Sequence, residues 1–384
     1  MRLAIYGGSF NPPHLGHLEV ARSVCAELAP DRLLIIPDNI PPHKELYPGS
    51  PSPEERMELC ALNFASVAQA ELSDMEILRE GKSYTAHTVE ELIALYPGDE
   101  LVLVVGSDMF LSFEQWYRFE WLLEKCHLAV LSREEDDRLE LLEHKDKLEG
   151  EYGAKITVLS HEAMPMCSED IRTLLRRRMG REYLSDEVYE SIIRHGYYEA
   201  QPDLTWLREK VLPYLSSHRL AHVAGCESEA VLLALHWGED AENAATAAIL
   251  HDITKALSYE EQLILCEKYG IILGNDELGN EKILHPITGA ALARDLFGIS
   301  DEIYEAIRWH TTGKGDMSLL EKIIYLADYI EPTRDFPGLD KLRELCYENI
   351  DAAMALGLEM SLEEIRQRNV EPHPASVEAL IWYK

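Results

Sequence analysis

Apolar and polar residues alternate differently in the two halves of this 384-residue chain. In the first half, short apolar runs are separated by stretches in which apolar residues recur every three or four positions. The short runs predict buried strands and the periodic stretches predict amphipathic helices. The predicted strands cover residues 3–6, 33–37, 101–106, 128–132 and 156–160, and the predicted helices include 18–29, 53–65 and 86–96. Strands that alternate with helices predict an α/β domain with a mostly parallel sheet covered on both faces.

The second half shows helical periodicity and no convincing strand. Its predicted helices cover residues 205–215, 227–238, 241–253, 258–270, 287–298, 301–310 and 319–331. The stretch EAQPDLTW (199–206) places a proline before an Asp-Leu-Thr helix start, which is typical of a linker. A chain of this length also exceeds what one core usually supports. The sequence therefore predicts an α/β domain over residues 1–198 and an all-α domain over residues 203–384.

The charge balance narrows the classes of partner. With 69 acidic residues against 36 basic ones, the formal net charge is −33. Such a surface repels nucleic-acid backbones and anionic membranes, so we expect neither a nucleic acid polymer nor a membrane as partner. Free nucleotides are repelled as well, which means that a phosphate site must supply its own cations.

The remaining bulk features favour a cytoplasmic protein. No apolar run reaches the ~20 residues of a membrane-spanning helix. The chain starts on a strand and a glycine turn, which is unlike a signal peptide. Its seven cysteines are scattered and form no CxxC pair, which argues against a disulfide framework or a zinc ribbon. The oligomeric state stays open, and a homo-oligomer is compatible with the sequence.

The stretch GGSFNPPHLGH (7–17) directly follows the first predicted strand. Gly7 and Gly8 permit a tight turn and close approach to a ligand. His14 and His17 lie three residues apart, on one face of the first turn of the next helix. Imidazole donors and the helix dipole both favour phosphate there, at the strand end where open α/β sheets bind ligands. A glycine turn with surface histidines would explain either part alone, but the combination predicts a nucleotide-phosphate site.

This stretch resembles the (H/T)xGH signature of nucleotidylyltransferases, and in its full form that of bacterial nicotinate-nucleotide adenylyltransferases. The resemblance covers residues 1–198 and includes PDNIPPHK (37–44), GKSYTAHTVEEL (81–92), VVGSDMFLSFEQWYRFEWLL (104–123) and SEDIRTLLRRRM (168–179). It implies a Rossmann-like fold and transfer of AMP from ATP, bound with Mg²⁺, to nicotinate mononucleotide. The attacking phosphate is already an anion, so catalysis would rest on positioning and charge neutralisation.

The resemblance also implies roles for the matching residues. The catalytic residues would be His14, His17, Lys44 and Arg172, and the substrate-binding residues would be Gly7, Gly8, Ser9, Phe10, Tyr84, Thr85, Gly106, Asp108, Trp116, Ser168 and Arg172. Ser168 and Arg172 would hold the β- and γ-phosphates, and Lys44 would lie over the ATP phosphates. Tyr84 and Thr85 would take the nicotinate carboxylate.

Three of these residues have structural alternatives. Lys44 could simply be an exposed loop lysine. Trp116 would stack on the pyridine ring, although an isolated tryptophan is often part of the core. Asp108 would bind ribose hydroxyls, although it could simply cap the next helix. The chain also departs from the family, because Cys167-Ser168-Glu169 replaces the usual Ser-Ser-Thr. A carboxylate near the phosphates should weaken the contact with ATP.

A second cluster of candidate residues lies in the helical half. Five apolar segments each carry metal-binding residue types, namely His222, His251 with Asp252, His285, His310 and Asp328. One such residue is usually a buried polar group with a partner. Burying all of them without partners would cost on the order of several kcal/mol each. Imidazole and carboxylate ligands together suit iron, manganese or similar ions.

The order His…His-Asp…His…His…Asp resembles that of HD-domain phosphohydrolases with two metals. This resemblance implies that His222, His251, Asp252 and Asp328 hold one transition metal, iron or manganese. His285 and His310 would hold the second, with Asp252 bridging. Asp252 and Lys255 would be catalytic, and Arg219, Lys255 and Arg334 would contact phosphates, with a simple surface position as the alternative for these three cations.

A narrower resemblance concerns the substrate. SHRLAHVAGC (217–226), HPITGA (285–290), ADYIEPTRDFPG (327–338) and EPHPAS (371–376) resemble a bacterial HD subfamily that splits diadenosine tetraphosphate into two ADP. It covers residues 203–384 and implies a dinucleoside polyphosphate, or another nucleotide, as substrate. One alternative is an HD domain that only senses nucleotides. Another is a different transferase, which would use phosphopantetheine or a cytidylyl group, although SYT (83–85) and FEQWY (113–117) favour nicotinate.

Overall fold

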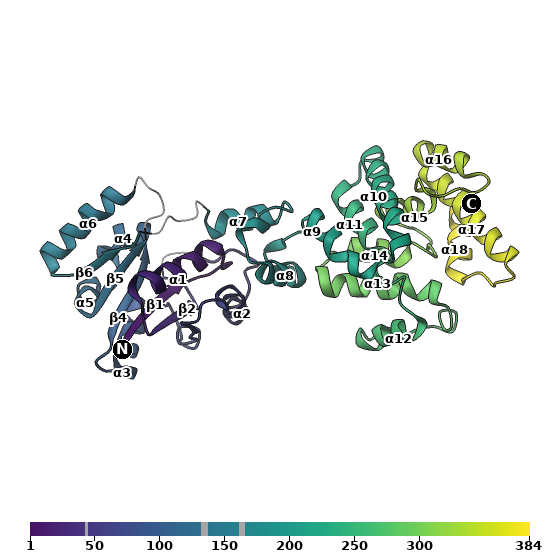
Figure 1. Ribbon diagram of the computed structural model, residues 1–384. Helices are drawn as coiled ribbons and strands as arrows, with labels where there is room; N and C mark the ends of the chain where they lie inside the picture. The colour runs from purple at the N-terminus through teal and green to yellow at the C-terminus, as the bar shows by residue number, and fades with distance from the viewer. Residues whose placement is uncertain (43–44, 132–136, 161–165) are drawn as a thin grey trace. The chain divides into compact units, whose positions relative to one another are not determined.

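The computed structural model describes residues 1–42, 45–131, 137–160 and 166–384, shown in Figure 1. The chain divides into two compact units, Met1–Gln201 and Pro202–Lys384. The first unit combines a parallel sheet with helices, and the second is helical throughout its described residues. This is the fold class that the sequence predicts.

The first unit contains six strands among the described residues. The strands are β1 (Arg2–Gly8), β2 (Arg32–Pro37), β3 (Ala70–Leu72), β4 (Glu100–Gly106), β5 (Cys126–Leu131) and β6 (Lys155–Val158). The α-helices are α1 (Leu15–Leu28), α2 (Pro53–Phe64), α3 (Thr85–Leu95), α4 (Ser107–Leu111), α5 (Phe119–Lys125), α6 (Asp137–Tyr152), α7 (Ser168–Leu175) and α8 (Asp186–His195). The strand β3 was not predicted, because three residues with a charged Glu71 at the centre form no apolar run.

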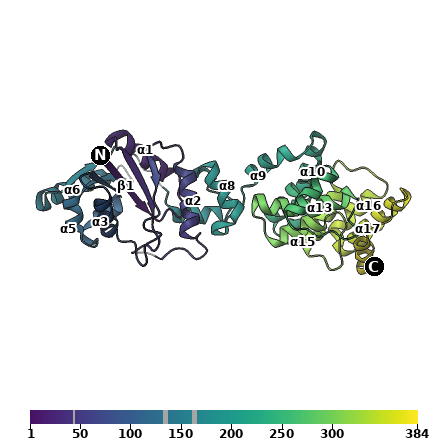
Figure 2. The same cartoon turned by 90° about the horizontal axis from the view of Figure 1, so that it is seen from below.

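The sheet has the order β3-β2-β1-β4-β5-β6 and every pairing is parallel. Successive side chains of β1 enter two different cores, as the two-residue period of a strand requires. Leu3 and Ile5 pack with residues of α3, α5 and α6, whereas Ala4 packs with residues of α1 and α2. Figure 2 shows α2 and α3 on opposite sides of β1.

The strand order reverses between β1 and β4. The chain adds β2 and β3 on one side of β1 and then crosses to the other side to form β4. In sheets of this kind, ligands bind at the carboxyl ends of the two strands that flank the reversal. Gly7 and Gly8 end β1, and Gly106 ends β4. The glycine stretch identified in the sequence therefore lies at the place where the topology favours a ligand.

A buried arginine on α2 fastens the loop that follows β1. The side chain of Arg56 is fully buried, and its guanidinium donates to the carbonyl oxygen of Ser9 at 2.5 Å. It also pairs with the Asp38 carboxylate at 3.2 Å and donates to the Asp38 carbonyl oxygen at 2.6 Å. Asp38 in turn accepts from the Ser9 hydroxyl at 2.7 Å. Arg56 and Asp38 thus fix where the chain leaves the sheet.

The second unit is built from helices only. They are α9 (Leu204–Val211), α10 (Ser217–Trp237), α11 (Ala241–Leu250), α12 (Tyr259–Lys268), α13 (Glu281–Phe297), α14 (Asp301–Trp309), α15 (Leu319–Ile330), α16 (Leu339–Glu348), α17 (Ile350–Gln367) and α18 (Pro374–Tyr383). The predicted helix 205–215 ends early, at Val211, because Pro213 lacks the N–H that an α-helix needs.

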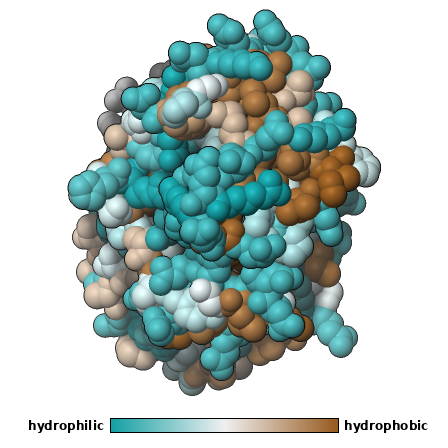
Figure 3. All heavy atoms as spheres, turned by 90° about the vertical axis from the view of Figure 1, so that its right-hand side faces the viewer, coloured by the Kyte–Doolittle hydropathy of each residue, from teal (hydrophilic) through white to brown (hydrophobic). Residues whose placement is uncertain are grey.

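The helices α10, α11, α14 and α15 form the centre of this unit. Helix α10 packs against α11 and α15, and α14 contacts α11, α13 and α15. The buried face of α11 consists mainly of alanines, such as Ala244 and Ala248, and short side chains allow neighbouring helices to approach closely. No helix among the described residues is long and apolar enough to span a membrane. Figure 3 shows a mainly hydrophilic face with smaller apolar patches.

The buried pair of Arg56 and Asp38 leads to a stability prediction. Arg56→Ala should lower the free energy of unfolding of the first unit by about 3–5 kcal/mol, because it leaves a buried carboxylate without its partner. Native-state hydrogen exchange of β1 amides measures this change. The matched control is Arg22→Ala, which removes a half-exposed pair with Glu19 and should cost at most about 1 kcal/mol. Equal losses in the two variants would contradict the prediction.

Candidate nucleotide and metal sites

The two glycines after β1 are not equivalent. A Cβ added to Gly8 would lie 3.3 Å from Cζ of the Phe10 ring, whereas a Cβ on Gly7 would meet only the Ile36 carbonyl oxygen at 3.9 Å. Phe10 has a positive φ of 43° and its ring is buried, 5.7 Å from the ring of Phe64. The loop therefore folds back over Gly8. Because the Phe10 side chain belongs to the core, this residue can contact a nucleotide only through its backbone.

His14 and His17 lie side by side at the start of α1. Their ring centroids are 3.7 Å apart, and the backbone N–H of His14 donates to Nδ1 of His17 at 3.2 Å. His14 is buried and His17 is half-buried. Since Nδ1 of His17 accepts a hydrogen bond, the ring hydrogen of its neutral form sits on Nε2. In that form Nε2 can donate to a phosphate oxygen.

Helix α7, which comes near the end of the unit's sequence, contacts the loop that follows β1. The Ser168 hydroxyl donates to the carbonyl oxygen of Pro12 at 2.9 Å, and the Arg172 guanidinium donates to that of Asn11 at 2.5 Å. The structure therefore brings Ser168 and Arg172 to the glycine loop. Sequence analysis missed Tyr47, whose ring lies 5.5 Å from the Arg172 guanidinium and 5.0 Å from that of Arg176. The spacing of the two arginines, one helical turn apart, could have indicated a shared partner.

The residues predicted for the nicotinate end surround the start of α3. Tyr84 is the N-cap of α3 and Thr85 is its first residue. The Tyr84 ring lies 5.3 Å from the ring of Tyr117, an exposed residue that sequence analysis did not single out. Trp116 is half-buried and packs against the core, with its ring 4.8 Å from that of Phe113. It can both belong to the core and present one face to a ligand.

Two predicted residues of this unit stand apart from the contacts above. Asp108 is exposed and is the second residue of α4, and the N-cap of that helix is Gly106. Lys44 lies outside the described residues. The structure therefore gives no contact for the lysine that the sequence places over the phosphates.

In the second unit, the six predicted metal ligands converge around one carboxylate, that of Asp252. Its Oδ2 lies 3.6 Å from Nε2 of His222 and 3.4 Å from Nε2 of His251, which we call the first histidine pair. Its Oδ1 lies 3.2 Å from Nε2 of His285 and 3.7 Å from Nε2 of His310, the second histidine pair. Each oxygen of Asp252 thus faces a different pair.

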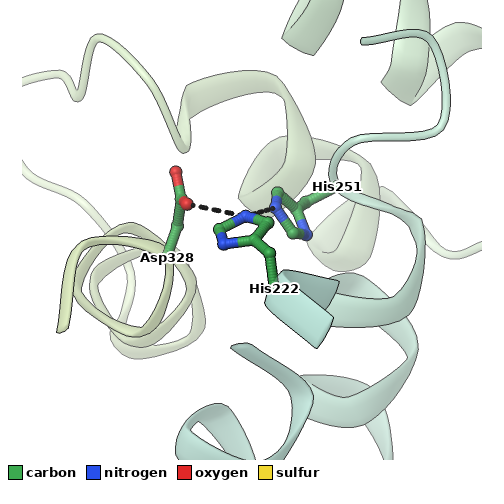
Figure 4. Close-up of side chains that lie close together, drawn as sticks. All are labelled: His222, His251 and Asp328. Carbon is green, nitrogen blue, oxygen red and sulfur yellow. Dashed lines mark hydrogen bonds and ion pairs between the residues drawn. The ribbon is translucent and has the colours of Figure 1, made fainter. Parts of the chain in front are cut away.

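Asp328 joins the first histidine pair. Its Oδ1 lies 3.1 Å from Nε2 of His222, which is itself 3.2 Å from Nε2 of His251, as Figure 4 shows. The ligand atoms of these three residues lie close enough to hold one metal ion, and the same is true of His251, Asp252 and His310. The six ligands come from five parts of the fold, namely α10, the ends of α11 and α14, α13 and α15.

The ends of two helices orient two of the histidines. His251 and His310 are the C-caps of α11 and α14. Their Nδ1 atoms lie 2.6 Å and 2.7 Å from the carbonyl oxygens three residues earlier, those of Ala248 and Ile307. A carbonyl oxygen only accepts, so each Nδ1 carries the hydrogen and each Nε2 lone pair turns toward Asp252. Converging lone pairs and carboxylate oxygens are a donor set that fits a divalent cation.

Burial and neighbouring charge set the protonation of the cluster. Burial lowers the pKa of His285 to about 3 and also lowers the pKa of His310, so both rings are neutral near pH 7. Burial alone would raise the pKa of Asp252, but the nearby His251 and hydrogen bonds from the histidines hold this pKa well below its usual value. Burial opposes the charged form of His222 too, yet hydrogen bonds to Asp252 and Asp328 raise its pKa to about 9. A metal at this position must displace that proton.

Three cations lie at the more exposed edge of the cluster. Arg219 pairs with Oδ2 of Asp252 at 3.0 Å, and Arg334 pairs with Oδ1 of Asp328 at 2.7 Å. Nζ of Lys255 lies 3.0 Å from Nε2 of His285, and burial lowers the pKa of this lysine. Their side chains are 26%, 37% and 28% exposed, against 2% for Asp252. A phosphate that approaches Asp252 from solvent would therefore meet these cations first.

A carboxylate that sequence analysis did not single out, that of Glu331, contacts the first histidine pair. Glu331, one helical turn after Asp328, has no exposed surface, and its Oε1 lies 3.1 Å from Nδ1 of His222. Burial alone would raise the pKa of Glu331, but hydrogen bonds from Thr333 outweigh it and lower the pKa. The spacing Asp-x-x-Glu at the end of an apolar helix was the available signal.

Comparison with known proteins agrees with this division. The model of the cytidylyltransferase-like family matches residues 5–179, and that of the HD domain matches residues 219–333. A "Probable nicotinate-nucleotide adenylyltransferase" of Carboxydothermus hydrogenoformans is 36% identical over 198 residues, which are 51% of this chain and 98% of the relative. A "Bis(5'-nucleosyl)-tetraphosphatase, symmetrical" of Halalkalibacterium halodurans is 40% identical over 169 residues, 43% of this chain and 88% of the relative.

The chain belongs to both families. Its first unit is a member of the nicotinate-nucleotide adenylyltransferase family, and its second is a member of the HD-domain family that contains the symmetrical tetraphosphatases. A solved structure from Clostridium acetobutylicum, described as a predicted HD superfamily hydrolase involved in NAD metabolism, is 34% identical. It covers 48% of this chain and 98% of its own, with a TM-score of 0.46.

The unequal surroundings of the two loop glycines give a second prediction. Gly8→Ala should lower the free energy of unfolding of the adenylyltransferase unit by about 1–3 kcal/mol, because the new methyl group presses on the buried Phe10 ring. Thermal or urea unfolding of both variants measures this loss. Gly7→Ala is the matched control, since its methyl group has room. A loss in Gly7→Ala as large as in Gly8→Ala would show that backbone freedom, not the ring, requires glycine here.

Proposed function

We propose that residues 1–198 transfer AMP from MgATP to nicotinate mononucleotide, giving deamido-NAD and pyrophosphate. The observation that carries the proposal is the pair His14 and His17 at the carboxyl end of β1, on the loop that also receives Ser168 and Arg172. A relative named for this activity is matched by this chain over 98% of its own length. Although the chain is strongly acidic, neutral donors and the guanidinium of Arg172 lie around this loop. A nucleotide phosphate requires such groups.

In this proposal the chain positions two anions and neutralises charge. Nε2–H of His17, with His14 beside it, donates to oxygens of the α-phosphate, where charge builds up during in-line attack. Lys44 adds a charge over the same phosphates, and Ser168 and Arg172 hold the departing pyrophosphate. The mononucleotide phosphate is already ionised, so no side chain needs to remove a proton.

The acceptor end of the proposed site lies around Tyr84. Backbone donors at Tyr84 and Thr85, at the start of α3, would take the nicotinate carboxylate, since a helix N-terminus favours an anion. The half-buried Trp116 would stack on the pyridine ring, and Asp108, next to Gly106, would bind ribose hydroxyls. The alternative is a cytidylyl or phosphopantetheine transferase. Such an enzyme would not need the aromatic side chains of Tyr84 and Trp116.

His17→Ala tests the first activity. Turnover with ATP and nicotinate mononucleotide should fall by at least about 100-fold, because a donor to the developing charge is lost. Chromatography of deamido-NAD and pyrophosphate measures the turnover. Mononucleotides other than nicotinate mononucleotide serve as competing acceptors. The control is His195→Ala, which removes an exposed histidine of the same unit. Near-normal transfer by the His17 variant would refute the assignment.

We further propose that residues 203–384 form a phosphohydrolase with two metal ions that splits diadenosine tetraphosphate into two ADP. The carrying observation is the division of the Asp252 oxygens between the two histidine pairs. One carboxylate between two sets of imidazoles suits a bridging ligand. When bound, two such ions would supply Lewis-acid charge neutralisation and water activation. The mixture of imidazole and carboxylate donors favours iron or manganese.

The chain's own residues would do the rest. His222, His251, Asp252 and Asp328 would hold one ion, and His285 and His310 would share Asp252 for the other. The cations Arg219, Lys255 and Arg334 lie at the edge of the cluster and would bind the remaining phosphates of a long polyphosphate. An HD domain that only senses nucleotides is the alternative. It would not need two complete ligand sets.

Metal content and product analysis test this centre together. Wild-type protein dialysed against Mn²⁺ should hold about two ions per chain, His310→Ala about one and Asp252→Asn fewer than one, as the ligand sets require. Elemental analysis gives these ratios. His236→Ala removes an exposed histidine of α10 and should match the wild type. Diadenosine tetraphosphate should yield ADP alone. A chelator should stop this hydrolysis. In the same wild-type protein, deamido-NAD synthesis should resume once Mg²⁺ is restored. Full hydrolysis by metal-free protein would refute the proposal.

We also propose that this protein acts in the cytoplasm on small nucleotides rather than on a nucleic acid polymer or a membrane. Its net charge of −33 supports this view, because only sites with local cations overcome the repulsion of phosphate. A homo-oligomer is compatible with the same data.

A further inference from the structure

We infer that Glu331 is a positioning residue, which holds His222 with Nε2 directed at the Asp252 cluster, and that Gly225 is a glycine because this carboxylate occupies the space beside it. The inference rests on the proposed metal centre. It assigns a function to two residues that no metal needs to touch.

His222 differs from two other histidines of the cluster in its place on a helix. His251 and His310 end their helices, where the carbonyl oxygens three residues earlier accept from Nδ1. His222 lies inside α10, where backbone carbonyl oxygens are already engaged by the helix. Its Nδ1 therefore needs a side-chain acceptor, and Glu331 supplies one at 3.1 Å. An ionised carboxylate only accepts, so the hydrogen at this contact belongs to Nδ1.

Glu331 is itself held in place. The backbone N–H of Thr333 donates to its Oε2 at 2.6 Å and the Thr333 hydroxyl to its Oε1 at 2.5 Å. Nε of Arg334 lies 3.5 Å from Oε1, and the same guanidinium pairs with Asp328. The turn after α15 thus fixes the acceptor for His222 and a cation beside Asp328 together. Carboxylates that accept from the second nitrogen of a metal-binding histidine fix both ring orientation and basicity.

Gly225 lies on the same face of α10 as His222, one turn further on. A Cβ on Gly225 would be 2.6 Å from Oε2 of Glu331 and 3.2 Å from Cδ of Pro332. Its backbone does not need a glycine, since its φ is not in the left-handed region. A glycine inside a helix costs about 0.8–1 kcal/mol relative to alanine. The space that Gly225 leaves for Glu331 accounts for its presence.

The test is the affinity of the full chain for Mn²⁺, measured by competition with a chelating dye. Glu331→Gln and Gly225→Ala should each weaken Mn²⁺ binding at the position that includes His222 about 10–100-fold, because the ring of His222 loses its anionic partner. The double variant should bind no more weakly than the weaker single variant, since both changes break one contact. These readouts do not require hydrolysis. Circular dichroism checks that each variant is folded.

Two matched controls separate positioning from general damage. Glu321→Gln alters another buried glutamate of α15, which pairs with Lys314 at 2.7 Å. Gly357→Ala alters another glycine inside a helix, where the added methyl group would make only ordinary contacts, the nearest with Leu326 at 3.6 Å. Both controls should keep wild-type affinity. Equal affinity of Glu331→Gln and Glu321→Gln, or multiplied losses in the double variant, would overturn the inference. If the wild type binds no Mn²⁺, the proposed metal centre fails instead.

Discussion

An acidic chain can bind nucleotide phosphates only where local positive charge outweighs its own field. With a net charge of −33, this protein must gather donors and cations at a few places. In the first unit, the guanidinium of Arg172 donates to the loop that leads to the paired imidazoles of His14 and His17. In the second unit, donors and cations surround Asp252. Most of the architecture around each site serves to hold these groups in place against the repulsion.

The two units use helix ends in opposite ways. In the first unit, the amino-terminal end of α1 carries His14 as its N-cap, where the helix dipole favours an anion. In the second unit, the carboxyl-terminal ends of α11 and α14 carry His251 and His310. The carbonyl oxygens of Ala248 and Ile307 fix each Nδ1, which directs each Nε2 toward the cluster. The same backbone polarity therefore prepares one site for an anion and the other for a cation.

The sequence predicted the fold class and the convergence of the helical histidines, because both follow from apolar periodicity and from residues that are costly to bury singly. It did not predict β3, because three residues with a charged Glu71 at the centre show no apolar run, although they pair with β2. It also missed Arg56, Tyr47 and Glu331. Each of these acts through a partner far away in the chain, so a local spacing can at most suggest it and cannot name the partner. The roles of the individual site residues remain predictions, and Lys44 lies outside the described residues.

Charge counting connects the geometry of the second unit to the length of its proposed substrate. Three carboxylates, those of Asp252, Asp328 and Glu331, are in direct contact with the first histidine pair, and the three cations Arg219, Lys255 and Arg334 contact the same cluster. These charges cancel. Two divalent ions, bound as proposed, would therefore add about four positive charges to this balanced set. A tetraphosphate bridge between two nucleosides carries about four negative charges. With two ions bound as proposed, a monophosphate would leave much of this positive charge unbalanced, so the count of charges would favour a long polyphosphate over a short one.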